Sequence, residues 1–184
     1  MKKIGVFCAS SEALNPDFYV RAEELGFFLG SHDMALVYGG AEMGLMEAVA
    51  SGVRRAVPFS AANPRVIGVV PDILFEKGAV SSLPDRVMRC RDLTERKAIM
   101  MRESDILVAM PGSVGTLDEA FSTMAQKVIG IAQKKVIFWN MDGFWNGLFE
   151  LFEKMKMTGV VNKPLEDLYM RADSLEEVEK FLLA

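Results

Sequence analysis

The residues best suited to chemistry follow an apolar stretch in the middle of the chain. Pro111-Gly112-Ser113-Val114-Gly115-Thr116-Leu117-Asp118-Glu119 comes directly after Ile106-Leu107-Val108-Ala109-Met110, a run typical of a buried β-strand. Glycines allow bare backbone N–H groups to approach a ligand, and the start of a helix adds unpaired donors and a partial positive charge. The segment is therefore a candidate phosphate-binding loop.

The same spacing also suits a plain strand-to-helix turn. Thr116 would then be the N-cap of the helix and Glu119 its partner in a capping box, Thr-x-x-Glu. The segment is not a Walker loop, because no Lys-Ser/Thr follows its second glycine, and it lacks Gly-x-Gly-x-x-Gly. Residue types alone leave both interpretations open.

Two further segments carry weaker signals. Gly39-Gly40-x-x-x-Gly44 also joins a predicted strand to a predicted helix, as an ordinary turn would. Arg96 and Lys97 lie near the start of a helix whose Asp92-x-x-Glu95 is a plausible capping box. Cations there oppose the helix dipole, a local misfit that sometimes marks a site and otherwise belongs to a solvated face.

Short β-rich runs alternate with helical patterns along the whole chain, with one loose linker at about residues 57–63. The predicted strands are Ile4–Ala9, Ala35–Tyr38, Arg65–Val70, Val87–Arg89, Asp105–Met110 and Lys135–Trp139. The predicted helices are Pro16–Gly30, Thr116–Gln126, Trp145–Met157 and Ser174–Leu183, with two more passing through Met46 and Val49 and through Ala98 and Met101.

This alternation predicts an α/β protein: a single doubly wound domain, residues 1–184, with a mainly parallel sheet. In such sheets, ligands bind beyond the carboxyl ends of the strands. The segments that follow the strands, including both glycine-rich loops, should therefore converge on one site.

Five motifs occur together and in order, and they resemble those of the Lonely Guy (LOG) family of nucleoside 5′-monophosphate phosphoribohydrolases, which activate cytokinins and were long mislabelled lysine decarboxylases. The resemblance covers about residues 4–160. The motifs are Phe7-Cys8-Ala9-Ser10-Ser11, Tyr38-Gly39-Gly40-Ala41-x-x-Gly44-Leu45-Met46, Glu95-Arg96-Lys97-x-x-Met100, Pro111-Gly112-Ser113-x-Gly115-Thr116-x-x-Glu119 and Asn140-x-Asp142-Gly143-Phe144.

The resemblance implies a Rossmann-like fold and hydrolysis of the N-glycosidic bond of a purine nucleoside 5′-monophosphate, either a cytokinin nucleotide or AMP. It implies a homodimer and neither a metal nor a cofactor. Arg96 and Glu119 would be catalytic, with Glu119 at the third position of its helix. The substrate-binding residues would be Ser11, Gly39, Gly40, Lys97, Gly112, Ser113, Gly115 and Thr116.

The chain departs from the family pattern at Ala9, Ala41 and Ser113, where glycines are usual. A non-catalytic carrier of a nucleotide or of molybdenum cofactor on the same fold is therefore the alternative. Lysine decarboxylation is a poor third choice, because no lysine is recognisable as a pyridoxal-phosphate site. The acid that would protonate the leaving base is not identified; Asp72, Glu42 and Asp118 are candidates.

Composition excludes several other classes. Twenty-one basic against twenty-five acidic residues give a net charge of −4, so we expect no nucleic-acid or membrane partner. Cys8 and Cys90 are far apart without a Cys-x-x-Cys spacing, which favours reduced thiols in the cytoplasm over a disulfide. One histidine, His32, makes a zinc site improbable.

Overall fold

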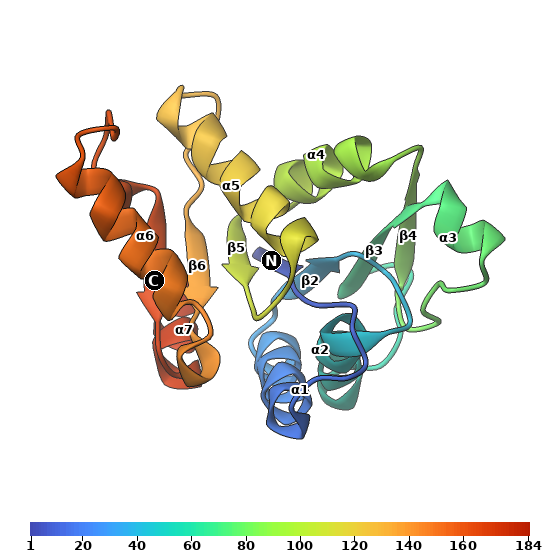
Figure 1. Ribbon diagram of the computed structural model, residues 1–184. Helices are drawn as coiled ribbons and strands as arrows, with labels where there is room; N and C mark the ends of the chain where they lie inside the picture. Colours follow the sequence, from blue (N-terminus) through green and yellow to red (C-terminus); the bar gives the residue numbers. More distant parts are fainter.

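A seven-stranded sheet forms the centre of the computed structural model, which describes residues 1–184 (Figure 1). Its spatial order is β4-β3-β2-β1-β5-β6-β7, and every pair is parallel. The predicted doubly wound, Rossmann-like class is therefore confirmed. The strands are β1 (Lys3–Phe7), β2 (Ala35–Tyr38), β3 (Val66–Pro71), β4 (Arg86–Cys90), β5 (Ile106–Ala109), β6 (Val136–Trp139) and β7 (Tyr169–Ala172).

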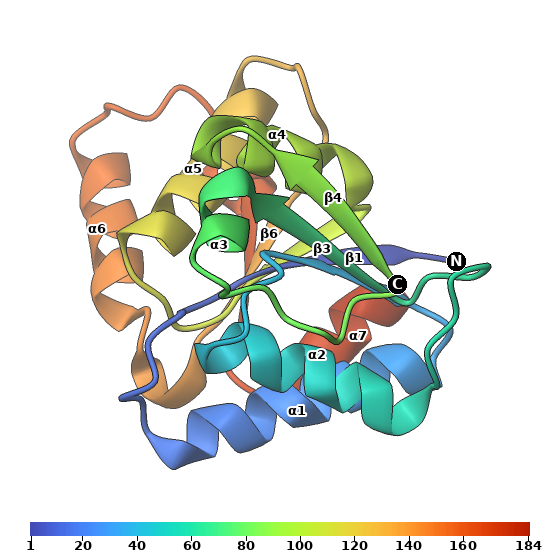
Figure 2. The same cartoon turned by 90° about the vertical axis from the view of Figure 1, so that its right-hand side faces the viewer.

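Helices cover both faces of this sheet, as Figures 1 and 2 show. On one face lie α1 (Pro16–Ser31), α2 (Gly44–Ala56) and α7 (Leu175–Leu183); on the other lie α4 (Leu93–Glu103), α5 (Val114–Val128) and α6 (Asn146–Met157). Each face buries its own apolar core. A short helix, α3 (Asp72–Glu76), follows β3, and single 3₁₀ turns occur at Met141–Gly143 and Leu165–Asp167. None of the helices has the length and apolarity required to cross a bilayer.

The chain reverses its winding direction beside β1, which pairs with β2 on one side and with β5 on the other. Helix α1, after β1, and helix α5, after β5, lie on opposite faces of the sheet (Figure 1). The loops after these two strands stay close, since the Ala9 N–H donates to the Pro111 carbonyl at 3.0 Å. This is the switch point at which open α/β sheets bind ligands.

Helices α1 and α2 pack with their backbones in contact, and two glycines make this possible. A Cβ on Gly26 would lie 2.0 Å from the Val49 carbonyl oxygen, and a Cβ on Gly52 would lie 2.0 Å from that of Glu23. No side chain fits in either place. This close contact fixes α2, whose first turn borders the cavity described below.

The segment at residues 57–63, expected to be a loose linker, contains no helix or strand but is anchored. The carboxylate of Asp85, fully buried, accepts hydrogen bonds from the backbone N–H groups of Ser60, Arg65 and Val66 and pairs with Arg54. Burial alone would raise the pKa of Asp85, but these hydrogen bonds together hold it below its ordinary value. One side chain therefore fixes the connection from α2 to β3.

Two elements were not predicted, and one predicted helix begins earlier than expected. Strand β7 has only one buried residue and helix α3 has none, so neither shows a buried apolar pattern in the sequence. Helix α5 begins at Val114, not Thr116, because Ser113 takes the extended conformation of an N-cap, with φ −98° and ψ −156°. The Thr116/Glu119 capping box that the spacing also allowed does not form, and Glu119 is the sixth residue of the helix, not the third as expected.

Candidate active site

A small cavity of about 140 Å³ opens at the switch point, between the residues after β1 and the first turns of α2, α4 and α5. Small-molecule sites are usually larger, at about 300–1,000 Å³. Five of its lining residues were predicted from sequence: Arg96, Ser113, Gly115, Thr116 and Glu119. Asp118, one of the candidate acids for the leaving base, also lines it, and the other four lining residues are Cys8, Ser10, Met46 and Leu93.

The N-terminus of α5 lacks a side-chain cap and faces this cavity. The side chain of Ser113 makes no hydrogen bond to the first turn, whereas Asn15, Asp92 and Ser174 cap α1, α4 and α7 through their side chains. Thr116 is buried instead against Gly112, where a Cβ would come within 2.1 Å of Thr116 Oγ1. The first N–H groups of α5 are therefore available to an anion.

Ser113 stands where the family pattern usually has a glycine. Its φ of −98° lies in the region that any residue adopts, so the serine costs no backbone strain. Ser113 is also one of the residues that line the cavity. A serine is therefore accommodated at this position without strain in the loop.

Arg96 extends from α4 into the cavity without an acidic partner. Its Nε is buried with no hydrogen-bond partner, and Nη2 donates a long hydrogen bond of 3.7 Å to Met46 Sδ. A guanidinium has five N–H donors and is always charged, so a buried one with so few partners is costly. This arginine is poised to bind an anionic or oxygen-rich ligand.

Glu119 lies on the neighbouring helix, and its environment alters its acidity. Burial raises the pKa of this carboxyl from 4.5 to about 7; the Arg96 charge lowers it, Asp118 raises it and Lys97 lowers it. A buried carboxyl with a pKa near neutrality and a cation beside it is characteristic of functional sites. Such a group exchanges a proton readily at pH 7.

Lys97 does not line the cavity. Its Nζ donates to both carboxylate oxygens of Asp118 at 2.8 Å, which ties α4 to α5 beside Glu119. Among the candidate acids for the leaving base, only Asp118 reaches the cavity. Asp72 instead pairs with Arg89, and Glu42 is exposed outside the cavity.

The loops after β1 and β2 shape the cavity more through backbone contacts than through side chains. Ser10 lines it, whereas the predicted Ser11 lies outside and accepts a hydrogen bond from the Ala13 N–H. Gly40, with φ +68°, forms a turn whose carbonyl accepts from the Ser81 N–H. Gly39 lies behind Arg96: a Cβ there would be 1.6 Å from Nη2.

Known proteins resemble this chain in sequence and in fold. The profile of the family described as "Possible lysine decarboxylase" matches residues 46–182. The chain is 31% identical over 181 residues to the cytokinin riboside 5′-monophosphate phosphoribohydrolase LOG3 of Arabidopsis thaliana, covering 98% of this chain and 81% of that protein. It is 33% identical to LOG1 of the same plant, with 98% and 82% covered.

This chain belongs to the LOG family. A solved structure of the molybdenum-cofactor carrier protein from Chlamydomonas reinhardtii shares the fold, with a TM-score of 0.73 at 21% identity over 99% of this chain and 95% of that one. The lysine-decarboxylase label of the family has no counterpart in the cavity of this LOG-family chain. No lysine lines that cavity, and the nearest, Lys97, is paired with Asp118.

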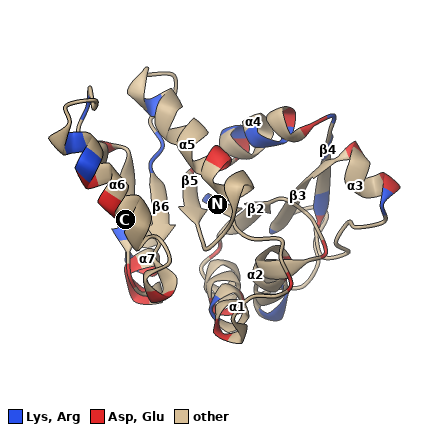
Figure 3. Ribbon diagram, viewed as in Figure 1, with Lys and Arg blue, Asp and Glu red and all other residues tan.

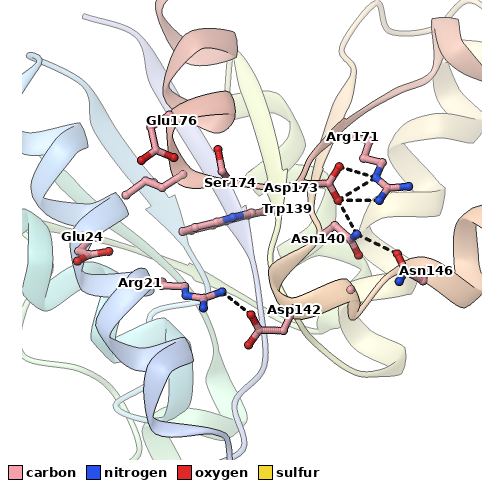
Figure 4. Close-up of a pocket in the computed structure, with 12 residues that line it drawn as sticks. Arg21, Glu24, Trp139, Asn140, Asp142, Asn146, Arg171, Asp173, Ser174 and Glu176 are labelled. Atoms are coloured by element: carbon pink, nitrogen blue, oxygen red, sulfur yellow. Dashed lines mark hydrogen bonds and ion pairs between the residues drawn. The ribbon is translucent and has the colours of Figure 1, made fainter.

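The last motif of the LOG pattern lies in a different, larger crevice of about 570 Å³ beyond β6 and β7 (Figure 4). There Asn140, only 3% exposed, donates to Asn146 at 3.0 Å and to Asp173 at 2.7 Å, and accepts from the Trp145 N–H. Arg171 pairs with Asp173. The motif therefore joins β6 to the turn before α6 and to the end of β7.

The residues that sequence reasoning did not select are mostly those without a distinctive signal. Met46 and Leu93 are ordinary apolar residues, and Cys8 belongs to a strand-end motif already noted. Burial and the nearby Glu119 charge raise the pKa of Cys8 well above its usual range, outweighing Arg96. The thiol therefore stays protonated and is a poor nucleophile.

Proposed function

We propose that this protein hydrolyses the N-glycosidic bond of purine nucleoside 5′-monophosphates, giving the free base and ribose 5-phosphate. The observation that carries the proposal is the convergence, in one cavity, of an arginine without an acidic partner, a half-buried carboxyl with raised pKa and a helix N-terminus without a side-chain cap. The names of the LOG relatives describe this reaction on cytokinin nucleotides.

Each group has a task in that reaction. The 5′-phosphate binds at the first turn of α5, through the N–H groups of Gly115 and Thr116 and the hydroxyl of Ser113. Glu119 lies about one turn further along, where an ionised carboxylate stabilises the positive charge that develops on the ribose ring. Arg96 binds ribose or phosphate oxygens through its unpaired N–H groups.

The bond changes are those of a simple hydrolysis. The C1′–N bond of the nucleotide breaks and its electron pair leaves with the base, while the oxygen of water forms a new bond to C1′. Glu119 accepts one proton of this water and later returns it to solvent, and the base takes up one proton from solvent at the nitrogen that was bound to the sugar. Water is the only co-reactant.

The test is direct. Purified protein is incubated separately with AMP and with its N6-isopentenyl derivative, and the free base is measured by chromatography. We expect base release that Glu119→Gln or Arg96→Ala lowers at least about 100-fold. Glu150→Gln, an exposed change on α6, is the matched control and should retain wild-type activity.

The outcomes separate the reaction from the alternative. Cleavage of both nucleotides shows a general purine substrate, and cleavage of the isopentenyl form alone shows a cytokinin nucleotidase. Tight nucleotide binding by calorimetry with no base released would instead favour a carrier. A protein that neither binds nor cleaves these nucleotides would refute both the proposed reaction and the carrier alternative.

We further propose that a second copy of the chain completes this site. The cavity is small, and two apolar side chains beside it are exposed: Leu93 at 66% and Val114 at 80%. A homodimer would cover them and enlarge the walls around the base. Light scattering should show a dimer. Val114→Asp should produce inactive monomers, whereas Val114→Ala should remain dimeric and active. A fully active monomer would contradict this arrangement.

We place the reaction in the cytoplasm, because both cysteines are free in the folded chain.

A further inference from the structure

Three elements meet around the guanidinium of Arg96. It comes from α4 and lies across Gly39, at the end of β2, where a Cβ would be 1.6 Å from Nη2 and 2.7 Å from Cζ. The same Cβ would be 2.7 Å from Met46 Sδ, on the first turn of α2. The absence of a side chain at Gly39 thus leaves a slot for the Arg96 guanidinium, and the Met46 sulfur borders this slot.

Met46 supplies the one hydrogen-bond acceptor that Arg96 has in this slot. Nη2 donates to Sδ at 3.7 Å, and Nε, although buried, has no partner. A thioether sulfur is a weak, uncharged acceptor. It therefore orients the guanidinium without neutralising its charge. A carboxylate in the same place would neutralise that charge.

We propose that Met46 is a positioning residue for the reaction: its sulfur, opposite Gly39, holds the Arg96 guanidinium toward the substrate while leaving its other N–H groups unpaired. This inference rests on the proposed function, since it concerns the same cavity. It assigns to a single methionine a role beyond filling the core.

The position of Arg96 has a measurable consequence for Glu119. The charged and titratable groups that act on this carboxyl are Arg96 and Lys97 from α4 and Asp118 from its own helix, with the Cys8 thiol nearby at the end of β1. Of these, Arg96 lowers its pKa most. A guanidinium that is no longer held in place would lower the Glu119 pKa less, and a merely structural role of Met46 would not change it.

The experiment compares Met46→Leu, which keeps the volume but removes the sulfur, with Met46→Gln, which restores an acceptor. Met124→Leu is the matched control: Met124 is 5% exposed, against 7% for Met46, and does not line the cavity. The kcat/KM of each protein is measured between pH 5.5 and 9. Thermal unfolding verifies that each one is folded.

We expect Met46→Leu to lower kcat/KM at pH 7 about 5- to 10-fold and to move the midpoint of its pH profile upward by about 0.5 pH unit or more. Met46→Gln should return the midpoint toward that of the wild type. Met124→Leu should change neither quantity. An unshifted midpoint in Met46→Leu, or an equal shift in Met124→Leu, would overturn the inference.

A second measurement tests the role of Met46 independently of whether the proposed reaction is observed. If the wild-type protein cleaves no nucleotide, the function fails, but the Glu119 carboxyl can still be titrated by NMR with ¹³C-labelled glutamate. An upward shift of its pKa in Met46→Leu alone would support the positioning role. Equal titration in all variants would overturn it.

Discussion

Replacing Glu119 with glutamine should make the protein inactive and, at alkaline pH, more stable. Burial raises the pKa of the Glu119 carboxyl from 4.5 to about 7 in the folded state, despite the attraction of Arg96. Between these two values the folded chain therefore binds a proton that the unfolded chain has released. Stability contributed by this group is complete below about pH 4.5 and is lost as the pH rises through about 7.

The size of the effect follows from the same values. Each tenfold change in proton affinity is worth about 1.4 kcal/mol, so the ionised carboxylate of Glu119 costs the folded state up to about 3 kcal/mol. Glutamine has nearly the same shape and carries no charge. Glu119→Gln should thus be more stable than the wild type by about 3 kcal/mol at pH 8.5, and by about 1–2 kcal/mol at pH 5.5.

Urea unfolding of both proteins at pH 5.5 and pH 8.5, followed by circular dichroism, gives the two differences in unfolding free energy. Glu150→Gln, on the exposed face of α6, should show no such dependence on pH. The reasoning would be refuted if Glu119→Gln were destabilised at pH 8.5, or if its difference from the wild type were equal at both pH values. Either result would mean that the carboxyl is not desolvated.

Three further outcomes are expected. The kcat/KM of the wild type should rise about tenfold per pH unit up to about pH 7 and then level off, because only ionised Glu119 stabilises the ribose cation; a flat profile would exclude this role. Gly52→Ala should lower the unfolding free energy by about 2 kcal/mol or more in urea, since its Cβ would lie 2.0 Å from the Glu23 carbonyl oxygen, whereas Gly147→Ala, in open space on α6, should raise it slightly. Asp85→Asn should lower the unfolding free energy in urea by about 3 kcal/mol at pH 7. This loss should become smaller in acid, where wild-type Asp85, whose pKa is lowered in the folded state, is protonated as well. An equal loss at all pH values would contradict the hydrogen bonds described for its carboxylate.

The alternation of strands and helices was sufficient to predict the class of this fold. Continuous apolar runs such as Val136–Trp139 are buried on both faces, which is the pattern of a parallel sheet. Strand β7 escaped prediction because its four residues include the exposed Arg171 and follow a polar segment. Its place at the sheet edge is decided by pairing with β6, which leaves no local signal.

The candidate site could be predicted where it depends on the ends of strands and not where it depends on packing. Ser113, Gly115 and Thr116 follow β5 and begin α5, whereas Arg96 and Glu119 were selected through the resemblance to the LOG family; the topology brings all five to one cavity. Lys97 belongs to the same motif as Arg96, but the side chains of consecutive helical residues point about 100° apart around the helix axis. Its side chain therefore meets Asp118 instead of the cavity, which no spacing rule indicates.

The acidic net charge of the chain does not oppose the proposed phosphate site, because the charges that matter there are local. Acidic and basic side chains are interspersed along the helices (Figure 3), so the net charge of −4 creates no broad attraction for anions. Within the cavity, however, Arg96 is unpaired and the first turn of α5 is uncapped, while Glu119 is partly protonated at pH 7. A folded chain with no ligand would be more stable with each of these features satisfied. A ligand with an anionic group near the helix N-terminus and the arginine, and with positive charge developing near the carboxylate, would reduce this cost. The proposed substrate, a nucleotide that is losing its base, has both features.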